Sequence, residues 1–116
     1  MIELVEVDKN NWRDCIRLEL LPEQERNLSS NAVTLAQSRF EEDIVCLAVQ
    51  LEDKIIGMLA YRREDEPGIS NLYWLFRFMI DKQYQSLGYG KRSLALLAQQ
   101  LQEAGGVCLR SMINPG

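Results

Sequence analysis

The segment with the most chemical information is Gln85-Ser86-Leu87-Gly88-Tyr89-Gly90-Lys91-Arg92, which contains two glycines and ends in two cations. It lies between an apolar stretch, residues 71–80, and an amphipathic stretch, residues 90–104. Glycine lets a backbone turn tightly and approach a ligand closely, and a helix N-terminus presents unpaired N–H groups with a partial positive charge. The segment is therefore typical of an anion-binding loop, most often one for phosphate or pyrophosphate.

Two cations in the first turn of the expected helix strengthen this interpretation. Lys91 and Arg92 oppose the helix macrodipole, where acidic residues are the usual choice, and a bound anion explains the exception. Two well-known phosphate loops do not fit. A Walker A loop requires Gly where Gln85 stands, and the dinucleotide fingerprint requires Gly where Ser93 stands. What remains is the pattern Q-x-x-G-x-G between a buried strand and a helix.

Hydrophobic periodicity predicts the elements that position this loop. The strand, loop, helix and strand between residues 71 and 113 form a right-handed crossover, so these two strands must be parallel. The order β-α-α-β-β-β-α-β indicates an α/β (α+β) fold with a mixed central sheet, in one domain over residues 1–116. We expect strands at residues 2–7, 44–51, 54–63, 71–80 and 107–113, and helices at residues 11–21 and 90–104. A further helix is expected from a cap at Ser30 or Asn31 to a close at residues 41–43.

Residue types exclude several classes of protein. The chain contains no histidine, which excludes Ser-His-Asp and Cys-His catalysis and any His-based metal site. Three cysteines, Cys15, Cys46 and Cys108, form no C-x-x-C pair, so we expect no metal site and favour buried reduced thiols. Thirteen Lys and Arg against seventeen Asp and Glu give a net charge of −4, which disfavours a nucleic-acid partner.

Cysteine usage and hydropathy predict a cytoplasmic protein. Widely spaced reduced thiols fit a reducing compartment. Residues 1–6 have neither a basic region nor a long apolar run, so no signal peptide is expected. The most apolar stretch, residues 72–80, is too short to cross a bilayer and contains Arg77, so no membrane partner is expected.

The residues that lead into the loop resemble a known family. The fourth strand and pyrophosphate loop of the GCN5-related N-acetyltransferase (GNAT) superfamily are similar to the stretch Arg77-Phe78-Met79-Ile80-Asp81-Lys82-Gln83-Tyr84-Gln85-Ser86-Leu87-Gly88-Tyr89-Gly90. The stretch most resembles the bacterial spermine/spermidine acetyltransferase branch, and the expected element order is that of the family from its first to its fifth strand. The resemblance implies the GNAT acyl-CoA N-acyltransferase fold over the whole chain, without the family's usual last helix and two strands.

The cofactor of that family is acetyl-CoA, and the resemblance implies how this chain would hold it. Its pyrophosphate would contact main-chain N–H groups of the loop, and Lys91 would add charge. The pantetheine arm would pair with the fourth strand where that strand and the fifth splay apart. A main-chain amide of the fourth strand would polarise the thioester carbonyl, and a neutral amine would attack without an acyl-enzyme. The implied cofactor-binding residues are Phe78, Met79, Ile80, Gln85, Ser86, Leu87, Gly88, Tyr89, Gly90 and Lys91.

Two differences from the family pattern bear on activity. Ser86 and Leu87 stand where the family often has a glycine and a basic residue. The family's fourth helix commonly supplies a Tyr that protonates the leaving thiolate and an Asn that helps to hold the cofactor, whereas this sequence ends at Gly116. No catalytic residue is therefore assigned. Residues 107–113 are expected to form an exposed apolar edge, through which we expect a homodimer.

Other side chains have both a functional and a structural interpretation. Asp81 fits a loop cap better than a general base. Strict alternation places Tyr73 and Arg77 on one face of their strand, where they would line a cleft, unless a β-bulge changes the count. For Arg77, a snorkelling or paired strand residue is the simpler interpretation. Three aromatic residues are expected in the core: Trp12, Trp74 and Phe76.

The expected function is acetyl transfer from acetyl-CoA to a primary amine, with a polyamine as one candidate acceptor. Glu19, Glu23 and Glu25 flank the loop between the first two helices, which in this family borders the acceptor site. Carboxylates there suit a polyamine, although a solvated acidic loop is the simpler interpretation. The alternatives are a CoA-binding module that does not catalyse and a protein-interaction domain with the same fold.

Overall fold

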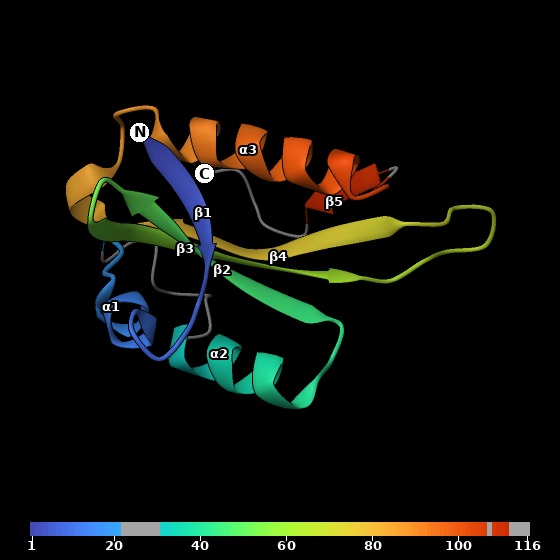
Figure 1. The fold of residues 1–116 in the computed structure, drawn as a ribbon, viewed down its shortest axis with the longest axis horizontal. Coiled ribbons are helices and arrows are strands. Elements are labelled where there is room, and N and C mark those ends of the chain that lie inside the picture. The colour runs from blue at the N-terminus through green and yellow to red at the C-terminus, as the bar shows by residue number, and fades with distance from the viewer. Residues whose placement is uncertain (22–30, 107, 112–116) are drawn as a thin grey trace.

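A computed structural model describes residues 1–21, 31–106 and 108–111 of the chain. Five strands form one sheet in the order β1-β2-β3-β4-β5, and helices cover both of its faces (Figure 1). Neighbours from β1 to β4 are antiparallel, and β5 is parallel to β4, as the predicted crossover requires. The elements are β1 (Ile2–Glu6), α1 (Trp12–Arg17), α2 (Asn31–Phe40), β2 (Ile44–Leu51), β3 (Lys54–Arg63), β4 (Leu72–Ile80), the 3₁₀ turn η2 (Lys82–Tyr84), α3 (Tyr89–Glu103) and β5 (Cys108–Ser111).

The predicted element order and mixed sheet are confirmed, and two layers of helix flank the sheet. Figure 1 shows α3 on one face, and α1 and α2 on the other. Leu97 and Leu101 of α3 are buried against leucines of β2, β3 and β4. Each fully buried leucine contributes about 1.5–3 kcal/mol of transfer free energy. The opposite face has a smaller cluster, built around Cys15 and Met58.

Helix α1 is shorter than the sequence predicts. It ends at Arg17, because Leu18 adopts an extended backbone with φ −60° and ψ 138°, and not at the Pro22 stop signal. The predicted core position of Trp12 is also wrong, since this residue is 39% exposed. The guanidinium of Arg13 lies over the Trp12 ring, 4.9 Å from its centroid. The indole is therefore a surface group that carries a cation–π contact.

The side of α2 that is buried differs from the side that the spacing of its apolar residues predicts. Val33 and Phe40 match the apolar spacing of a buried helix face, yet Phe40 is 84% exposed. The buried residues of α2 are polar instead, Asn31 and Thr34. These two buried polar side chains need hydrogen-bond partners, as buried polar groups do. Hydrophobic periodicity cannot predict their positions, because it follows apolar residues only.

A β-bulge in β4 changes which layer each of its side chains contacts. Ala60 of β3 is opposite Arg77, and the next residue, Tyr61, is opposite Leu75, so Phe76 is the extra residue. Before the bulge, Leu75 packs against α3. After it, Arg77 bonds to α2. The expectation from strict alternation, that Tyr73 and Arg77 share a face, is therefore wrong, and the bulge that would change the count is present.

Within the described residues, every helix is too short or too polar to span a membrane.

Candidate functional site

The loop between β4 and α3 begins at a well-anchored residue, Asp81. Its Oδ2 accepts a hydrogen bond from the Gln83 N–H at 3.2 Å and so caps η2. Its Oδ1 accepts from the Glu19 N–H at 2.7 Å, and its own N–H donates to the carbonyl of Ile56 at 2.7 Å. Both carboxylate oxygens are thus used within the protein. The loop-cap interpretation of Asp81 is confirmed, and this geometry gives no support to a general base.

Glu19 ties the segment after α1 to the same loop. Its carbonyl accepts from the Lys82 N–H at 2.7 Å, and its carboxylate lies 2.7 Å from the Lys82 ammonium. Both side chains are largely exposed, so this ion pair contributes about 0–1 kcal/mol. The pair also bears on ligand binding, because the Glu19 carboxylate already has a cationic partner within the protein. Glu23 and Glu25 lie outside the described residues.

The loop then folds back over the end of β4. The Gln85 side-chain amide donates to the carbonyl of Ile80 at 2.9 Å. Ser86 and Gly88 both have left-handed backbones, with φ 65° and φ 87°. Glycine adopts such angles freely, whereas serine is strained there. The side chain of Leu87 is 61% exposed, so the tip of the loop faces solvent.

The N-terminus of α3 completes the loop. Gly88 is its N-cap residue, no side chain caps it, and its first turn contains no acidic residue. In the first main-chain hydrogen bond of the helix, the Arg92 N–H donates to the Gly88 carbonyl at 3.1 Å. The N–H groups of the first turn precede this bond and have no acceptor inside the helix. This end of α3 therefore presents donors and a partial positive charge.

The end of β4 lies directly beside this helix terminus. A Cβ placed on Gly90 would lie 3.5 Å from the Phe78 ring, so α3 starts in contact with the strand. On the other side, β3 approaches so closely that a Cβ on Gly57 would lie 2.5 Å from the Met79 carbonyl oxygen. Glycine at position 57 thus lets β3 close on Met79, whereas a side chain at position 90 would make only an ordinary van der Waals contact with Phe78. These contacts fix the main chain of this part of β4.

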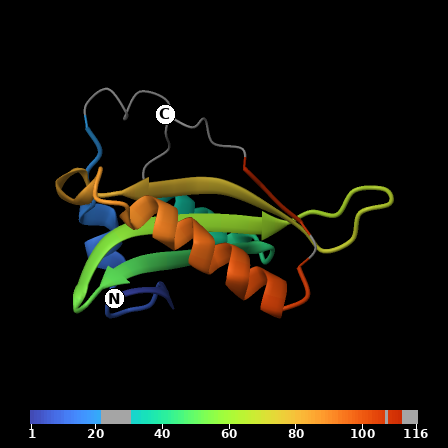
Figure 2. The same ribbon diagram turned by 90° about the horizontal axis from the view of Figure 1, so that it is seen from above.

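One edge of β4 is partly open next to the loop. The described part of β5 pairs with β4 only at Leu72–Leu75, and Figure 2 shows β5 turning away from the line of β4. Within the described residues, the main chain of residues 76–80 has no strand partner on this side. All four described residues of β5 pair with β4, so the splay expected of the fourth and fifth strands stays a prediction. The remainder of the predicted strand, residues 112–113, and residue 107 lie outside the described residues.

The structure brings the predicted cofactor-binding residues together. Phe78 and Ile80 point to the α3 side, where they pack with apolar residues of α3. Met79 points to the opposite side, and its Sδ accepts from the Asn31 side chain at 3.0 Å. The seven loop and helix residues, from Gln85 to Lys91, follow directly along the chain, and Lys91 is exposed. Whether each residue contacts a cofactor stays a prediction.

A buried polar cluster on the α2 side was not foreseen from the sequence. Arg77 is only 5% exposed, and its Nε and Nη2 donate to Asn31 Oδ1 at 2.9 and 2.6 Å. The Asn31 amide in turn donates to the carbonyl of Cys15 at 2.8 Å. Arg77 Nη1 is buried, and none of the described residues gives it a hydrogen-bond partner. The two side chains are 46 residues apart in sequence, and no local motif announces their contact.

The two cysteines whose side chains the structure describes, Cys15 and Cys46, offer no nucleophile at this site. Burial raises the pKa of the Cys15 thiol from 9.0 to about 12, and nearby Asp14 adds to the effect. Burial also raises the pKa of Cys46, against a hydrogen bond from Ser38 that lowers it. Both thiols are therefore protonated at neutral pH. Among the described residues, no group of three His, Cys, Asp or Glu side chains is placed to hold a metal ion.

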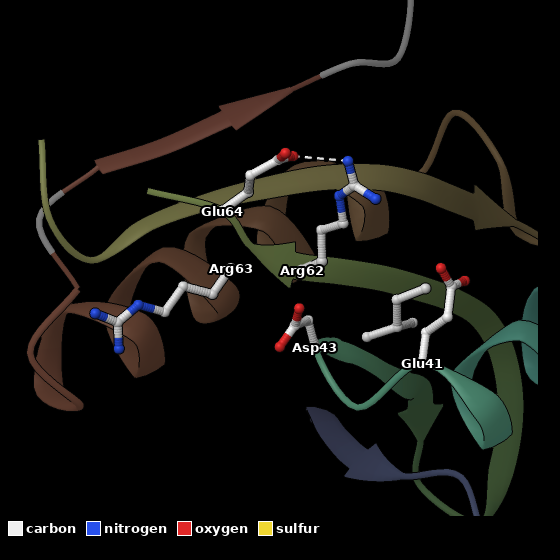
Figure 3. Close-up of a pocket in the computed structure, with 6 residues that line it drawn as sticks. Glu41, Asp43, Arg62, Arg63 and Glu64 are labelled. Carbon is white, nitrogen blue, oxygen red and sulfur yellow. Dashed lines mark hydrogen bonds and ion pairs between the residues drawn. The ribbon is translucent and has the colours of Figure 1, made fainter. Parts of the chain in front are cut away.

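A charged surface depression lies at the other end of the sheet (Figure 3). It is lined by residues that follow α2 and end β3, among them Asp43 and Arg62. Arg62 pairs with Glu64 at 2.7 Å, so part of its charge is balanced locally. In the sheet, Arg62 is opposite Trp74, whereas Ile80, next to the loop, is opposite Gly57. None of the predicted site residues lines this depression.

Comparison with known proteins identifies the family. A sequence model of the "Acetyltransferase (GNAT) family" matches residues 7–113. The chain belongs to this family. No curated protein sequence matches it. The GNAT family transfers acetyl groups from acetyl-CoA to amines, and the predicted fold class is confirmed.

Solved structures of GNAT proteins share this fold at low sequence identity. A GNAT acetyltransferase of Brucella melitensis in complex with acetyl-CoA has a TM-score of 0.78 at 13% identity, over 100% of this chain and 78% of that chain. A GNAT acetyltransferase of Staphylococcus aureus has a TM-score of 0.76 at 17% identity, over 99% and 87%. An aminoglycoside acetyltransferase from an uncultured soil metagenomic sample, in complex with sisomicin, has a TM-score of 0.71 at 18% identity, over 97% and 78%.

Proposed function

We propose that this GNAT chain transfers the acetyl group of acetyl-CoA to a small primary amine. The observation that carries the proposal is the uncapped N-terminus of α3 beside the open edge of β4. The neutral amine nitrogen attacks the thioester carbonyl carbon, a C–N bond forms and the C–S bond breaks. The proton released by the amine balances the charge of the leaving thiolate, so the products are an N-acetyl amine and CoA.

The residues of this chain would have separate roles in that reaction. Main-chain N–H groups from Gln85 to Gly90 would bind the pyrophosphate, with charge from Lys91. The exposed main-chain edge of residues 78–80 would pair with the extended pantetheine arm, as a strand pairs with a sheet edge. An N–H group of β4 would stabilise the negative charge that develops on the carbonyl oxygen. Direct attack needs no histidine, which agrees with the composition.

A polyamine remains a narrower candidate for the acceptor. The acidic residues near the loop between the first two helices support it. That support is weaker than the sequence indicates, because the Glu19 carboxylate is already paired with Lys82. Spermidine is therefore a substrate to test beside other amines. Membership of the spermine/spermidine branch and a cytoplasmic location stay predictions.

A second candidate function is acetyl-CoA or CoA binding without catalysis. It is favoured by the loop itself, where Ser86 is held at a left-handed φ of 65° and Leu87 supplies no charge. Both features weaken anion binding relative to a loop with glycine and a basic residue. An amine screen separates the candidates: binding of acetyl-CoA without any acetylated product supports the binding module.

We also propose that the chain forms a homodimer through β5. Within the described sheet β5 is an end strand, so its outer edge has no strand partner there. Such an edge is a template for pairing with another chain. Light scattering at high micromolar concentration is expected to give twice the monomer mass, and a monomer would contradict the proposal.

The test of cofactor binding uses two matched glycines. Gly88 and Gly68 have φ values of 87° and 81°, and a Cβ at either would meet nothing within 4 Å. Alanine at either position costs about 1–2 kcal/mol through the same backbone strain. Only Gly88 lies in the candidate loop, because Gly68 belongs to the turn between β3 and β4.

Isothermal titration with acetyl-CoA is expected to show micromolar binding for the wild type and for Gly68→Ala. Gly88→Ala is expected to lose most of this affinity while unfolding at a temperature similar to that of Gly68→Ala. Equal affinities in the two variants would refute binding at the loop. No heat from the wild type at millimolar acetyl-CoA would refute both candidate functions and leave an interaction domain.

A further inference from the structure

Arg77 is a buried cation that the proposed reaction leaves without a role. The residue is 5% exposed, and its guanidinium has no carboxylate partner in the described structure. Burial lowers the pKa of Arg77 below its usual value, and no acidic group in the described part of the chain counteracts this effect. Removing an unpaired charge from water costs several kcal/mol. We therefore look for an anionic partner that would offset the desolvation free energy of Arg77.

The guanidinium is held in one orientation with one nitrogen left over. Nε and Nη2 both donate to Asn31 Oδ1, and Nη2 lies 3.9 Å from the Met79 sulfur. Nη1 has no partner among the described residues. The side chain of Asn31 is itself fixed by its bonds to Cys15 and Met79. A planar guanidinium fixed along one side presents its remaining N–H groups in a set direction.

The surroundings of this nitrogen also favour negative charge. Asn31 is the first residue of α2, and the first turn of α2 contains no acidic residue. A helix N-terminus carries a partial positive charge, which adds to that of Arg77. Two positive features of different origin thus meet at the contact between β4 and α2. An oxygen anion is the partner that suits both.

Arg77 also lies at the right point along β4. In the described structure, the part of β4 without a strand partner on this side starts at the Phe76 bulge, and residues 78–80 lead from there to the loop. A chain that starts at the loop and extends along residues 80 to 78 reaches Arg77 next. The Arg77 side chain faces α2, away from α3 and its N-terminus. An acceptor amine that attacks the acetyl group at this end of residues 78–80 would therefore lie beside the Arg77 guanidinium.

We propose that Arg77 binds a carboxylate of the acceptor, so that the substrate is a carboxylate-bearing primary amine such as a free amino acid. This inference rests on the proposed acetyl transfer and narrows it to one class of acceptor. The carboxylate supplies the counter-charge that the described structure lacks and accepts from Nη1. A polyamine, which has several positive charges and no carboxylate, is the acceptor that this site disfavours.

The experiment compares acetylation of matched amines. Initial rates are measured for a panel of free α-amino acids, their carboxamides and spermidine, at saturating acetyl-CoA. The wild type is expected to favour at least one free amino acid over its carboxamide by about 10- to 100-fold in kcat/KM, the usual effect of a hydrogen bond to a charged group. A wild type that acetylates spermidine or the carboxamides equally well would overturn the inference while leaving acetyl transfer intact.

Two variants locate the effect at Arg77. Arg77→Met is expected to raise KM for the amino acid and abolish its advantage over the carboxamide, with the affinity for acetyl-CoA unchanged. Arg77→Lys keeps the charge and is expected to keep part of the preference, so it decides the matter if the methionine variant does not fold. A preference that survives unchanged in both variants contradicts the assignment.

A failure of the proposed function has a different signature. If no amine is acetylated, acetyl transfer fails, and carboxylate binding is then measured directly. The unfolding temperature is recorded in millimolar N-acetyl amino acids and in their carboxamides. A rise with the acids that is confined to the wild type supports the site at Arg77. Equal rises in wild type and Arg77→Met, or none, overturn it.

Discussion

The Asp81 side chain and the Glu19 main chain join the end of β4 to the segment that follows α1. Asp81 Oδ1 accepts from the Glu19 N–H at 2.7 Å, and beside this bond the Glu19 carbonyl accepts from the Lys82 N–H at 2.7 Å. Asp81 and Glu19 are 62 residues apart in sequence. The loop proposed to hold the cofactor is therefore fixed to the segment that leads to the loop between α1 and α2. Of these two bonds, only the one to Asp81 depends on a side chain.

Replacing Asp81 by alanine removes both the cap of η2 and the bond to Glu19. We expect a loss of about 1–2 kcal/mol of stability, the usual effect of losing a capping oxygen. We also expect weaker acetyl-CoA binding, because the loop loses its anchor. Urea unfolding and calorimetric titration measure the two effects. Asp81→Asn keeps one accepting oxygen and should lose less, and an alanine variant as stable as the wild type would contradict the assigned cap.

Lys91→Glu is expected to change stability and binding in opposite directions. An acidic residue in the first turn of α3 interacts favourably with the helix dipole, by about 0.3–1 kcal/mol. The same carboxylate repels a bound pyrophosphate. The variant should therefore unfold at higher urea concentration and bind acetyl-CoA more weakly, with Lys91→Gln between it and the wild type. Equal acetyl-CoA affinities in all three proteins would show that Lys91 does not contribute to binding.

Ser86→Gly is expected to strengthen both the fold and the loop. Serine at φ 65° is strained, and glycine at this position relieves the strain. After the larger backbone entropy of unfolded glycine is counted, the expected gain is about 0.5–1 kcal/mol. Asn71, with φ 56°, lies outside the loop and serves as the control. Asn71→Gly should leave acetyl-CoA affinity unchanged, whereas Ser86→Gly should increase it; a decrease would contradict the assigned loop.

The buried thiol of Cys15 makes stability fall at alkaline pH. Burial raises the pKa of Cys15 from 9.0 to about 12, so the folded chain keeps a proton that the unfolded chain releases. Stability from this group is complete below the unfolded pKa and decreases as pH rises between the two values. Urea unfolding at about pH 7 and at about pH 10 should show a larger loss in the wild type than in Cys15→Ala. Identical losses would mean that the thiol is accessible.

The sequence predicts those parts of the fold and site that rest on local patterns. The strand at residues 71–80, the loop from Gln85 to Gly90 and the following helix are announced by an apolar run, glycine spacing and amphipathic periodicity. The structure confirms these elements and brings the predicted residues together. The role of each residue in cofactor binding stays a prediction.

What the sequence does not predict depends on contacts between distant segments. The pairing of Arg77 with Asn31 arises from the approach of α2 to β4, and neither residue has a local reason to be buried. Helix α1 stops at Arg17, and two residues later Glu19 is bonded to Asp81 at the end of β4, a contact that no local signal announces. In both cases tertiary hydrogen bonds decide between alternatives that local propensity leaves equal.

The single extra residue in β4 decides which face every later side chain of the strand takes. Phe76 shifts the alternation, so that leucine before it packs on α3 and arginine after it bonds to α2. If the strand were regular at the same length, Leu75 and Arg77 would share a face, and the arginine would enter the leucine layer while the apolar residues beyond it exchanged faces. Deleting Phe76 would instead make Leu75 and Arg77 neighbours and leave both on their present faces. An irregularity of the backbone, and not the order of the side chains, therefore keeps this charge out of the leucine layer.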